Sequence, residues 1–179
     1  MIEIQLVDKT FQLFIPNSSI LDKIEELAQQ INKAYSGQQL EILVLLDGAK
    51  MFADAIMPRF EFNYNAHYQQ VKSYQGMHSV GAIQFDRQLL NQFRGKNLLI
   101  LEDIVDTGNT LKQLSEVLLA QNLEQLAIAT LLYKPLQLKH PIPLNFIGFE
   151  IGPEFVVGFG MDYNECGREL KDIYHLKSQ

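Results

Sequence analysis

Three carboxylates stand where a run of apolar residues ends in the middle of the chain. Residues 98–101, with the sequence LLIL, lead directly into Glu102 and Asp103, and Asp106 follows three positions later. A continuous apolar run of this kind predicts a strand that is covered on both faces. Two carboxylates at the end of a buried strand are costly unless a partner or a ligand compensates them, so their position predicts a binding site.

The segment that follows Asp106 has the composition of an anion-binding loop. Residues 107–110 read Thr-Gly-Asn-Thr and lead into an amphipathic stretch that predicts a helix over residues 110–122. The start of a helix presents unpaired backbone N–H groups with partial positive charge, which bind phosphate. Gly108 lets the backbone approach a ligand closely, and the Gly-Lys-Ser/Thr signature of a nucleotide P-loop is missing. The segment therefore suits a single phosphate monoester.

The three acids suit the sugar and the proton chemistry that accompany such a phosphate. The carboxylates of Glu102 and Asp103 can accept hydrogen bonds from a sugar diol, or bind Mg²⁺ directly or through water. Asp106, which is closer to the loop, can act as a general base. Together these features predict a site for a ribose 5-phosphate. The alternative is that Asp106 only caps the helix, which accounts for one acid and leaves the other two unexplained.

Composition and charge restrict the class of protein. The chain has 179 residues, of which 47% are hydrophobic and 20% are charged, as expected for one globular domain. Its net charge of -6 argues against a nucleic-acid partner, which needs a basic surface. The single cysteine, Cys166, excludes an internal disulfide framework and favours a reducing compartment. Because neither a signal peptide nor a membrane-spanning run is visible, we expect a cytoplasmic protein without a membrane partner.

Hydrophobic periodicity predicts strands that alternate with helices. We therefore expect an α/β fold with a mostly parallel twisted sheet and helices on both faces. Ligands of such sheets bind at the carboxyl ends of the strands, where residues 47–48, residues 102–103 and Lys134 all fall. The segment at 65–79 has no period and predicts a long loop. The predicted helices cover residues 18–35, with a Ser19–Asp22 capping box, 49–57 and 110–122, and the predicted strands cover residues 42–46, 59–64, 80–85, 97–103, 126–133, 146–151 and 155–161.

The stretch that contains the three acids resembles the signature of a known family. Residues 102–110, EDIVDTGNT, closely resemble the phosphoribosyl-pyrophosphate motif of type I phosphoribosyltransferases, and most closely the version found in the hypoxanthine-guanine phosphoribosyltransferases. The resemblance extends over about residues 42–170 and includes LLDGAKMF, VKSY, LLYKP, FIGFEI and EFVVGFGMDYNE, with Arg168 downstream. It implies a single domain over residues 1–179, with a core at about 20–150, a hood formed by residues 1–19 and 151–179, and a mobile loop at about 65–79.

The resemblance implies a purine-salvage transferase. Such an enzyme moves the 5-phosphoribosyl group from 5-phosphoribosyl 1-pyrophosphate to N9 of a 6-oxopurine, hypoxanthine or guanine, giving IMP or GMP and pyrophosphate. The resemblance also implies Mg²⁺ as cofactor and a homodimer or homotetramer. The alternative is a non-catalytic regulator of the same fold that senses phosphoribosyl pyrophosphate or a nucleotide. A regulator is expected to lose the general base or the purine pocket, yet Asp106, Lys134 and Phe155 are present.

The resemblance assigns roles to individual positions of this chain. Asp106 matches the catalytic group that faces purine N7, and Lys134 matches the group that donates to the 6-oxo oxygen. Phe155 matches the aromatic residue that stacks on the base, and Val156 the residue whose backbone pairs with the purine edge. Taken alone, Lys134 would be a surface lysine and Phe155 a core residue. The other matched positions are Glu102 and Asp103 for the ribose hydroxyls and magnesium, Asp106, Thr107, Gly108, Asn109 and Thr110 for the 5-phosphate, Leu46, Asp47 and Gly48 for pyrophosphate, Ser73 and Tyr74 for the loop that covers the site, Asp162 for a second magnesium, and Arg168 for pyrophosphate.

Asp47 departs from the family pattern, which usually has Lys or Arg at this position. Pyrophosphate repels a carboxylate unless magnesium intervenes or the side chain turns away, so the substitution bears directly on pyrophosphate binding.

Arg168 suits phosphate oxygens because its guanidinium binds them bidentately. Its alternative role is a solvated surface charge or an ion pair with Glu165 or Glu169.

Overall fold

The computed structural model describes residues 2–71, 73–76, 79–83 and 85–177. Its largest element is a five-stranded sheet whose neighbouring strands are all parallel. The apolar runs at 42–46, 97–103 and 126–133 form the three inner strands, as predicted, because an inner strand covered on both faces needs apolar residues on both. The predicted α/β fold class is confirmed. In order across the sheet the strands are β4 (Asn63–Gln70), β3 (Gln39–Leu46), β7 (Asn97–Val105), β8 (Gln125–Tyr133) and β9 (Phe146–Glu150).

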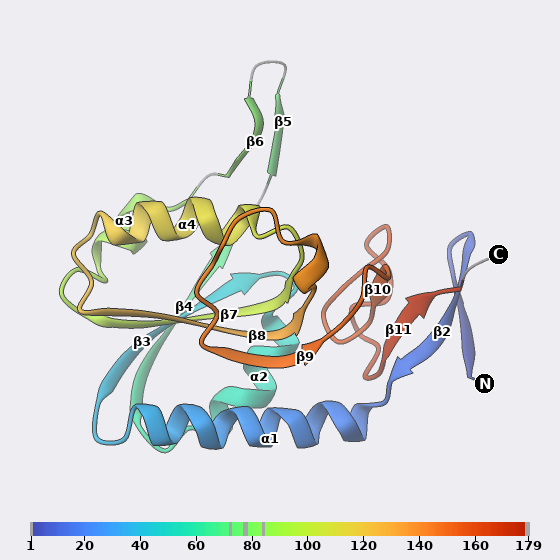
Figure 1. The fold of residues 1–179 in the computed structure, drawn as a ribbon, viewed down its shortest axis with the longest axis horizontal. Helices are drawn as coiled ribbons and strands as arrows, with labels where there is room; N and C mark the ends of the chain where they lie inside the picture. The colour runs from blue at the N-terminus through green and yellow to red at the C-terminus, as the bar shows by residue number, and fades with distance from the viewer. Residues whose placement is uncertain (1, 72, 77–78, 84, 178–179) are drawn as a thin grey trace.

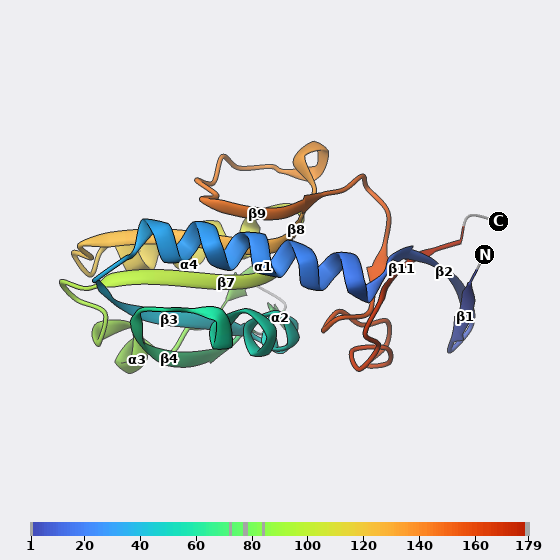
Figure 2. The ribbon, with the colours of Figure 1, turned by 90° about the horizontal axis from the view of Figure 1, so that it is seen from below.

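Helices cover both faces of this sheet (Figure 1, Figure 2). One face packs against the long first helix and the short second one in the larger hydrophobic cluster, and a second cluster joins the other face to the remaining helices. None of the helices in the described part of the chain is long and apolar enough to cross a membrane. The first group is α1 (Asn17–Ala34), α2 (Lys50–Ile56) and the 3-10 turn η1 (Met57–Arg59), and the second is α3 (Arg87–Asn91) and α4 (Asn109–Leu119); a further 3-10 turn, η2 (Pro135–Gln137), follows β8.

The start of α1 differs from the prediction. The helix begins at Asn17 after Pro16, so Ser19 lies inside its first turn, and the predicted Ser19–Asp22 capping box is wrong. The backbone N–H of Asn17 instead donates to the carboxylate of Asp172, 2.7 Å away. A distant segment therefore satisfies a helix start that local patterns assign to a cap. The apolar face predicted for this helix is buried, at Ile20, Ile24, Leu27 and Ile31.

The two ends of the described chain meet in a second, antiparallel sheet, which we call the small sheet. Figure 1 shows it to the right of the central sheet. Phe11, Val157 and Tyr174 form the small core of this second sheet. The strand predicted over 155–161 is wrong beyond Val157, because the backbone turns through positive φ at each of residues 158–160. The strands, in order, are β1 (Glu3–Leu6), β2 (Lys9–Ile15), β11 (Ile173–Leu176) and β10 (Val156–Val157).

The edge strand β4 contains the largest departure from the prediction. The strand predicted at 59–64 begins only at Asn63 and continues to Gln70, and it pairs with β3 along its whole length. The long loop predicted at 65–79 is therefore wrong, although its mobility stays a prediction. Pairing outweighs the polar composition of β4 because an edge strand leaves much of its surface to solvent. The same segment continues into an antiparallel hairpin of β5 (Ser73–Gly76) and β6 (Ser79–Ile83).

Candidate active site

The carboxyl ends of β3, β7 and β8 meet the small sheet around a cavity of about 410 Å³. This is the edge of a parallel sheet at which ligands are expected. Ser73 and Tyr74 belong to β5, and their side chains lie outside the described part of the structure. Every other site residue predicted from the sequence lines the cavity: Leu46, Asp47, Gly48, Glu102, Asp103, Asp106, Thr107, Gly108, Asn109, Thr110, Lys134, Phe155, Val156, Asp162 and Arg168.

Apolar side chains that the sequence motifs did not single out complete the lining. Their only signal in the sequence is that they adjoin the motif residues or end the same strands. They give the cavity a partly apolar wall, as is usual for a site that accepts an organic ligand. They are Leu45, Val71, Ile104, Val105, Leu111 and Met161.

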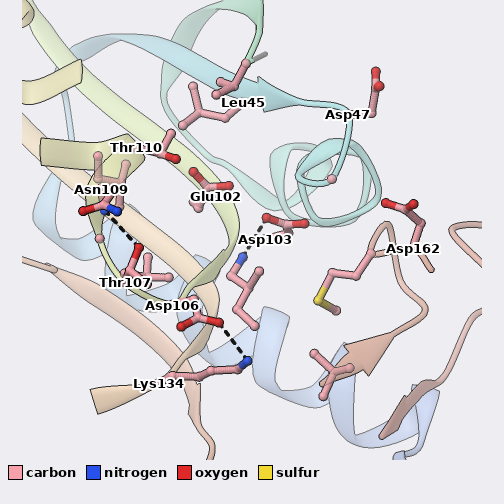
Figure 3. A pocket seen from close by; sticks show the side chains of 18 of the residues that line it. Leu45, Asp47, Glu102, Asp103, Asp106, Thr107, Asn109, Thr110, Lys134 and Asp162 are labelled. Atoms are coloured by element: carbon pink, nitrogen blue, oxygen red, sulfur yellow. Dashed lines mark hydrogen bonds and ion pairs between the residues drawn. The ribbon is translucent and has the colours of Figure 1, made fainter. Parts of the chain in front are cut away.

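Glu102 and Asp103 are adjacent near the end of β7 and both line the cavity (Figure 3). Asp103 is 9% exposed, and one of its oxygens accepts a hydrogen bond of 2.8 Å from the backbone N–H of Ile104. Burial raises the pKa of Asp103. Burial, together with the neighbouring charge of Asp103, raises the pKa of Glu102 well above its ordinary value. A buried and a half-buried acid with raised pKa values suit a site that receives a cation, because a cation favours their charged forms.

Lys134 and Asp106 form an ion pair inside the cavity, where Figure 3 shows their side chains pointing toward each other. The Lys134 Nζ atom lies 2.9 Å from Asp106 Oδ2. Lys134 is 5% exposed, so it is not a solvated surface lysine. The pair places a cationic hydrogen-bond donor and a carboxylate acceptor side by side, which is the complement of a ligand that carries an oxo group beside an N–H group.

The loop after Asp106 leads directly into α4. Gly108 is the N-cap of this helix and has a φ of 77°, a conformation that favours glycine. A Cβ atom at Gly108 would lie 2.6 Å from Ile142 and 2.9 Å from Leu138. Asp106 is therefore not the helix cap, which removes the alternative role considered for it. Residues 107–110, at the start of the helix, line the cavity, which is where a phosphate site is expected.

The end of β3 approaches the loop after β10 closely. The peptide bond between Leu46 and Asp47 is cis. A Cβ atom at Gly48 would lie 1.9 Å from Asp103 Oδ2, and a Cβ atom at Gly160 would lie 2.0 Å from the Gly48 carbonyl oxygen. Asp47 is exposed, and Figure 3 shows its carboxylate pointing away from the acid pair. The close approach of the Gly48 backbone to the Asp103 carboxylate and to the Gly160 backbone therefore sets this part of the cavity.

Arg168 is held by the same loop. One terminal nitrogen donates to the Gly160 carbonyl oxygen at 2.7 Å, and the other lies 2.6 Å from Asp162 Oδ1. The expected alternative of a pair with Glu165 or Glu169 is wrong, because the ion pair of Arg168 is with Asp162. The Arg168 side chain is 39% exposed and lines the cavity, so part of this side chain reaches solvent.

The small sheet supplies the last wall of the cavity. Phe155 is 47% exposed and lines the cavity, so it is not a core residue. Val156 is buried in β10 and pairs with His175 of β11. An exposed ring whose backbone is fixed by a neighbouring strand suits a flat apolar ligand.

The donor set for a metal consists of carboxylates alone. Within the described ranges, no group of three or more His, Cys, Asp and Glu side chains is arranged to hold a metal ion. Mg²⁺ is usually bound by one or two carboxylates while substrate phosphates and water complete its shell. Glu102 and Asp103, with Asp162 across the cavity, fit this mode of binding and do not fit an all-protein metal cage.

The sequence and the fold match known proteins over most of the chain. The phosphoribosyl transferase domain family matches residues 16–164, and the chain belongs to this family. Hypoxanthine phosphoribosyltransferase of Escherichia coli is 37% identical, with 92% of this chain and 94% of the relative covered. Hypoxanthine-guanine-xanthine phosphoribosyltransferase of Plasmodium falciparum is also 37% identical, with 89% and 74% covered. A crystal structure of hypoxanthine phosphoribosyltransferase from Staphylococcus aureus superposes with a TM-score of 0.86 at 35% identity, covering 93% of this chain and 91% of that one.

Proposed function

We propose that the protein is a purine-salvage enzyme that transfers the 5-phosphoribosyl group from 5-phosphoribosyl 1-pyrophosphate to N9 of a 6-oxopurine. The acceptors are hypoxanthine and guanine, and the products are IMP or GMP and pyrophosphate. The observation that carries the proposal is the Lys134–Asp106 ion pair, which lies in the cavity at the start of the phosphate-binding loop. Relatives that are 35–37% identical carry the names of enzymes with these activities.

The base pocket is built from one residue for each recognised feature of the purine. The Lys134 ammonium donates to the 6-oxo oxygen, and the Asp106 carboxylate accepts the proton of the N7–H group. The exposed ring of Phe155 stacks on the base, and the backbone of Val156 pairs with the purine edge. Adenine has an amino group where a 6-oxopurine has oxygen, so Lys134 disfavours it.

The sugar and its phosphate occupy the part of the cavity next to α4. The backbone N–H groups and hydroxyls of residues 107–110 bind the 5-phosphate at the start of the helix. Glu102 and Asp103 accept hydrogen bonds from the ribose hydroxyls and would hold one Mg²⁺, and Asp162 would hold a second. When bound, Mg²⁺ neutralises the charge of the pyrophosphate group. Arg168 adds a guanidinium at the same end of the cavity.

The reaction exchanges one bond at the anomeric carbon for another. The bond between this carbon and the pyrophosphate oxygen breaks, and pyrophosphate leaves with the electron pair. Purine N9 forms the new bond from the opposite face while Asp106 takes the N7 proton. Positive charge develops on the ribose ring, and water would trap it, so we propose that the β5–β6 hairpin, with Ser73 and Tyr74, covers the site during turnover.

The regulator considered from the sequence is not supported by the relatives, whose names are those of transferases. A homodimer or homotetramer and a cytoplasmic location remain predictions for this chain.

An activity panel tests the proposal. Purified protein is incubated with Mg²⁺, phosphoribosyl pyrophosphate and each of hypoxanthine, guanine, xanthine, adenine and uracil, and nucleotide formation is followed by chromatography. We expect IMP and GMP, and loss of both when excess chelator is added. If none of the five bases gives a nucleotide, the proposed transferase activity is refuted and the non-catalytic regulator becomes the better interpretation.

A further inference from the structure

The ring of Phe155 lies between the cavity and two other aromatic rings. Its centroid is 6.4 Å from that of Phe11 and 6.0 Å from that of Tyr163. The rings of Phe11 and Tyr163 also contact each other, with centroids 5.8 Å apart. The three rings thus form one aromatic cluster, and Phe155 is the member that lines the cavity.

Each member of the aromatic cluster is anchored in or beside the small sheet. Phe11 is 0% exposed in β2. The Tyr163 hydroxyl donates to the Asp8 carboxylate at 2.8 Å, in the turn between β1 and β2. The Leu176 backbone N–H of β11 donates to the Phe155 carbonyl oxygen at 2.8 Å. These contacts to the Phe155 backbone and to the rings behind its own ring come from the small sheet and its connecting segments.

We propose that Phe11 and Tyr163 are positioning residues that hold the ring of Phe155 in the orientation that stacks on the purine base. The inference rests on the proposed function, because it takes the base to stack on Phe155. A half-exposed ring loses rotational freedom when a ligand binds, and this loss weakens affinity. The tilted and edge-on contacts of the aromatic cluster restrict the ring before the base arrives.

This support lies partly outside the region that defines the family. Residues 1–15, which include β1 and β2, precede the matched residues 16–164. The phosphate-binding loop and the acid pair lie on the central sheet, while the aromatic cluster lies on the small one. Loosening the cluster should therefore weaken binding of the base more than binding of phosphoribosyl pyrophosphate, for which Asp162 lies beside Tyr163 on the same segment.

The test compares the two Michaelis constants in Phe11→Leu and Tyr163→Leu. We expect the KM for hypoxanthine to rise about 3- to 10-fold in each variant, the range that corresponds to losing one aromatic contact. The KM for phosphoribosyl pyrophosphate should change by a smaller factor than the KM for hypoxanthine. Tyr163→Phe keeps the ring and loses the hydrogen bond to Asp8, so its effect should be smaller than that of Tyr163→Leu.

A matched control lies on the same strand. Phe14 is 37% exposed, and its ring packs edge-on against His175 at 5.3 Å, so Phe14→Leu should leave both Michaelis constants unchanged. Thermal melting shows which variants are folded, and if Phe11→Leu does not fold, Tyr163→Leu decides alone. In a Phe155→Ala background, the effect of Tyr163→Leu on the hypoxanthine KM should disappear, because a positioning residue acts only through the ring that it positions.

Two results would overturn the inference. One is a folded Tyr163→Leu variant whose hypoxanthine KM is unchanged, or whose two Michaelis constants rise by the same factor. The other is an effect that persists in the Phe155→Ala background. A wild-type protein that forms no nucleotide from any 6-oxopurine gives a distinct result, because it refutes the proposed function and this inference with it.

Discussion

The side-chain nitrogen of Lys134 lies 2.9 Å from a carboxylate oxygen of Asp106, although the two residues differ greatly in exposure. The Lys134 side chain is 6% exposed and that of Asp106 is 45% exposed. A nearly buried ammonium is thus neutralised by a carboxylate that still faces the cavity. A purine that binds both side chains must replace the contact between Lys134 and Asp106 with contacts of its own. Each of the two residues therefore affects how the other binds the purine.

Asp106→Asn should lower turnover far more than it weakens binding of phosphoribosyl pyrophosphate. The amide cannot accept the N7 proton, and the loss of a general base typically lowers kcat by about 10²- to 10⁴-fold. Steady-state kinetics with hypoxanthine measures both quantities. Asp54→Asn is the control, since Asp54 is an exposed acid paired with Lys50 on α2. Equal losses in kcat and in affinity for phosphoribosyl pyrophosphate would show that Asp106 does not act as the general base.

Lys134→Met should raise the KM for hypoxanthine by about 10- to 100-fold, the effect of losing a hydrogen bond from a charged donor. The methionine side chain has a similar length and leaves Asp106 without its counter-charge. Lys112→Met is the matched control, because Lys112 is exposed on α4 and lies 3.9 Å from Glu116. An unchanged KM for hypoxanthine in the Lys134 variant would show that this ammonium does not contact the base.

Gly160→Ala should raise the KM for phosphoribosyl pyrophosphate. Gly160 has a φ of 100°, and a Cβ atom there would lie 2.0 Å from the Gly48 carbonyl oxygen, so the loop and the end of β3 must separate. Gly37→Ala separates the effect of strain from that of the clash, because Gly37 has a φ of 72° but no atom within 4 Å of the added carbon. If both variants behave alike, contact between Gly160 and Gly48 has no part in binding.

Glu41 should make the stability of the protein sensitive to acid. The residue is 3% exposed at the opposite end of the sheet, and its oxygens lie 2.9 Å from Lys96 Nζ, 2.6 Å from His67 Nε2 and 3.1 Å from Asn65 Nδ2. Burial alone would raise its pKa, but the hydrogen bonds from these partners lower the pKa below the ordinary 4.5. A lowered pKa in the folded state stabilises the fold fully above the unfolded value, and this contribution is lost as the pH falls through the folded value.

Glu41→Gln should therefore reduce the free energy of unfolding by about 1–3 kcal/mol at pH 7, since it replaces the buried charged acceptor of three hydrogen bonds with a neutral amide. The difference in the free energy of unfolding between the variant and the wild type should shrink as the pH falls below 4.5. Urea unfolding at pH 7 and at low pH measures it. Glu26→Gln is the control, because Glu26 is an exposed partner of Lys23 on α1. A difference that does not depend on pH would mean that the charge of Glu41 does not contribute.

The inner strands could be predicted because their residue types follow from their surroundings. Residues 97–103 and 126–133 are apolar because helices cover both faces of the sheet. The polar strand β4 could not be predicted in this way, because pairing with β3 defines it while solvent exposure sets its composition. The cap of α1 was missed for a similar reason, since its partner is Asp172.

The candidate site was predicted in part for the same reason. The acids at 102, 103 and 106 stand out because charged residues rarely end a buried strand, and the carboxyl edge of the sheet then brings them to Lys134. The support of Phe155 by Phe11 leaves no such signal. A buried phenylalanine is common in strands, so nothing in the sequence marks Phe11 as special. Only the folded chain shows that its ring packs against the ring of Phe155.

In the small sheet, β2 lies between β1 and β11, so a strand made early in synthesis must wait for a partner made after the whole of the central sheet. On the ribosome, the strands that carry the acids and the phosphate-binding loop exist before this partner emerges, and segments that emerge early can fold early. A nascent chain would thus form the strands that lead to Asp106 and Lys134 before it completes the small sheet beside Phe155 and Val156.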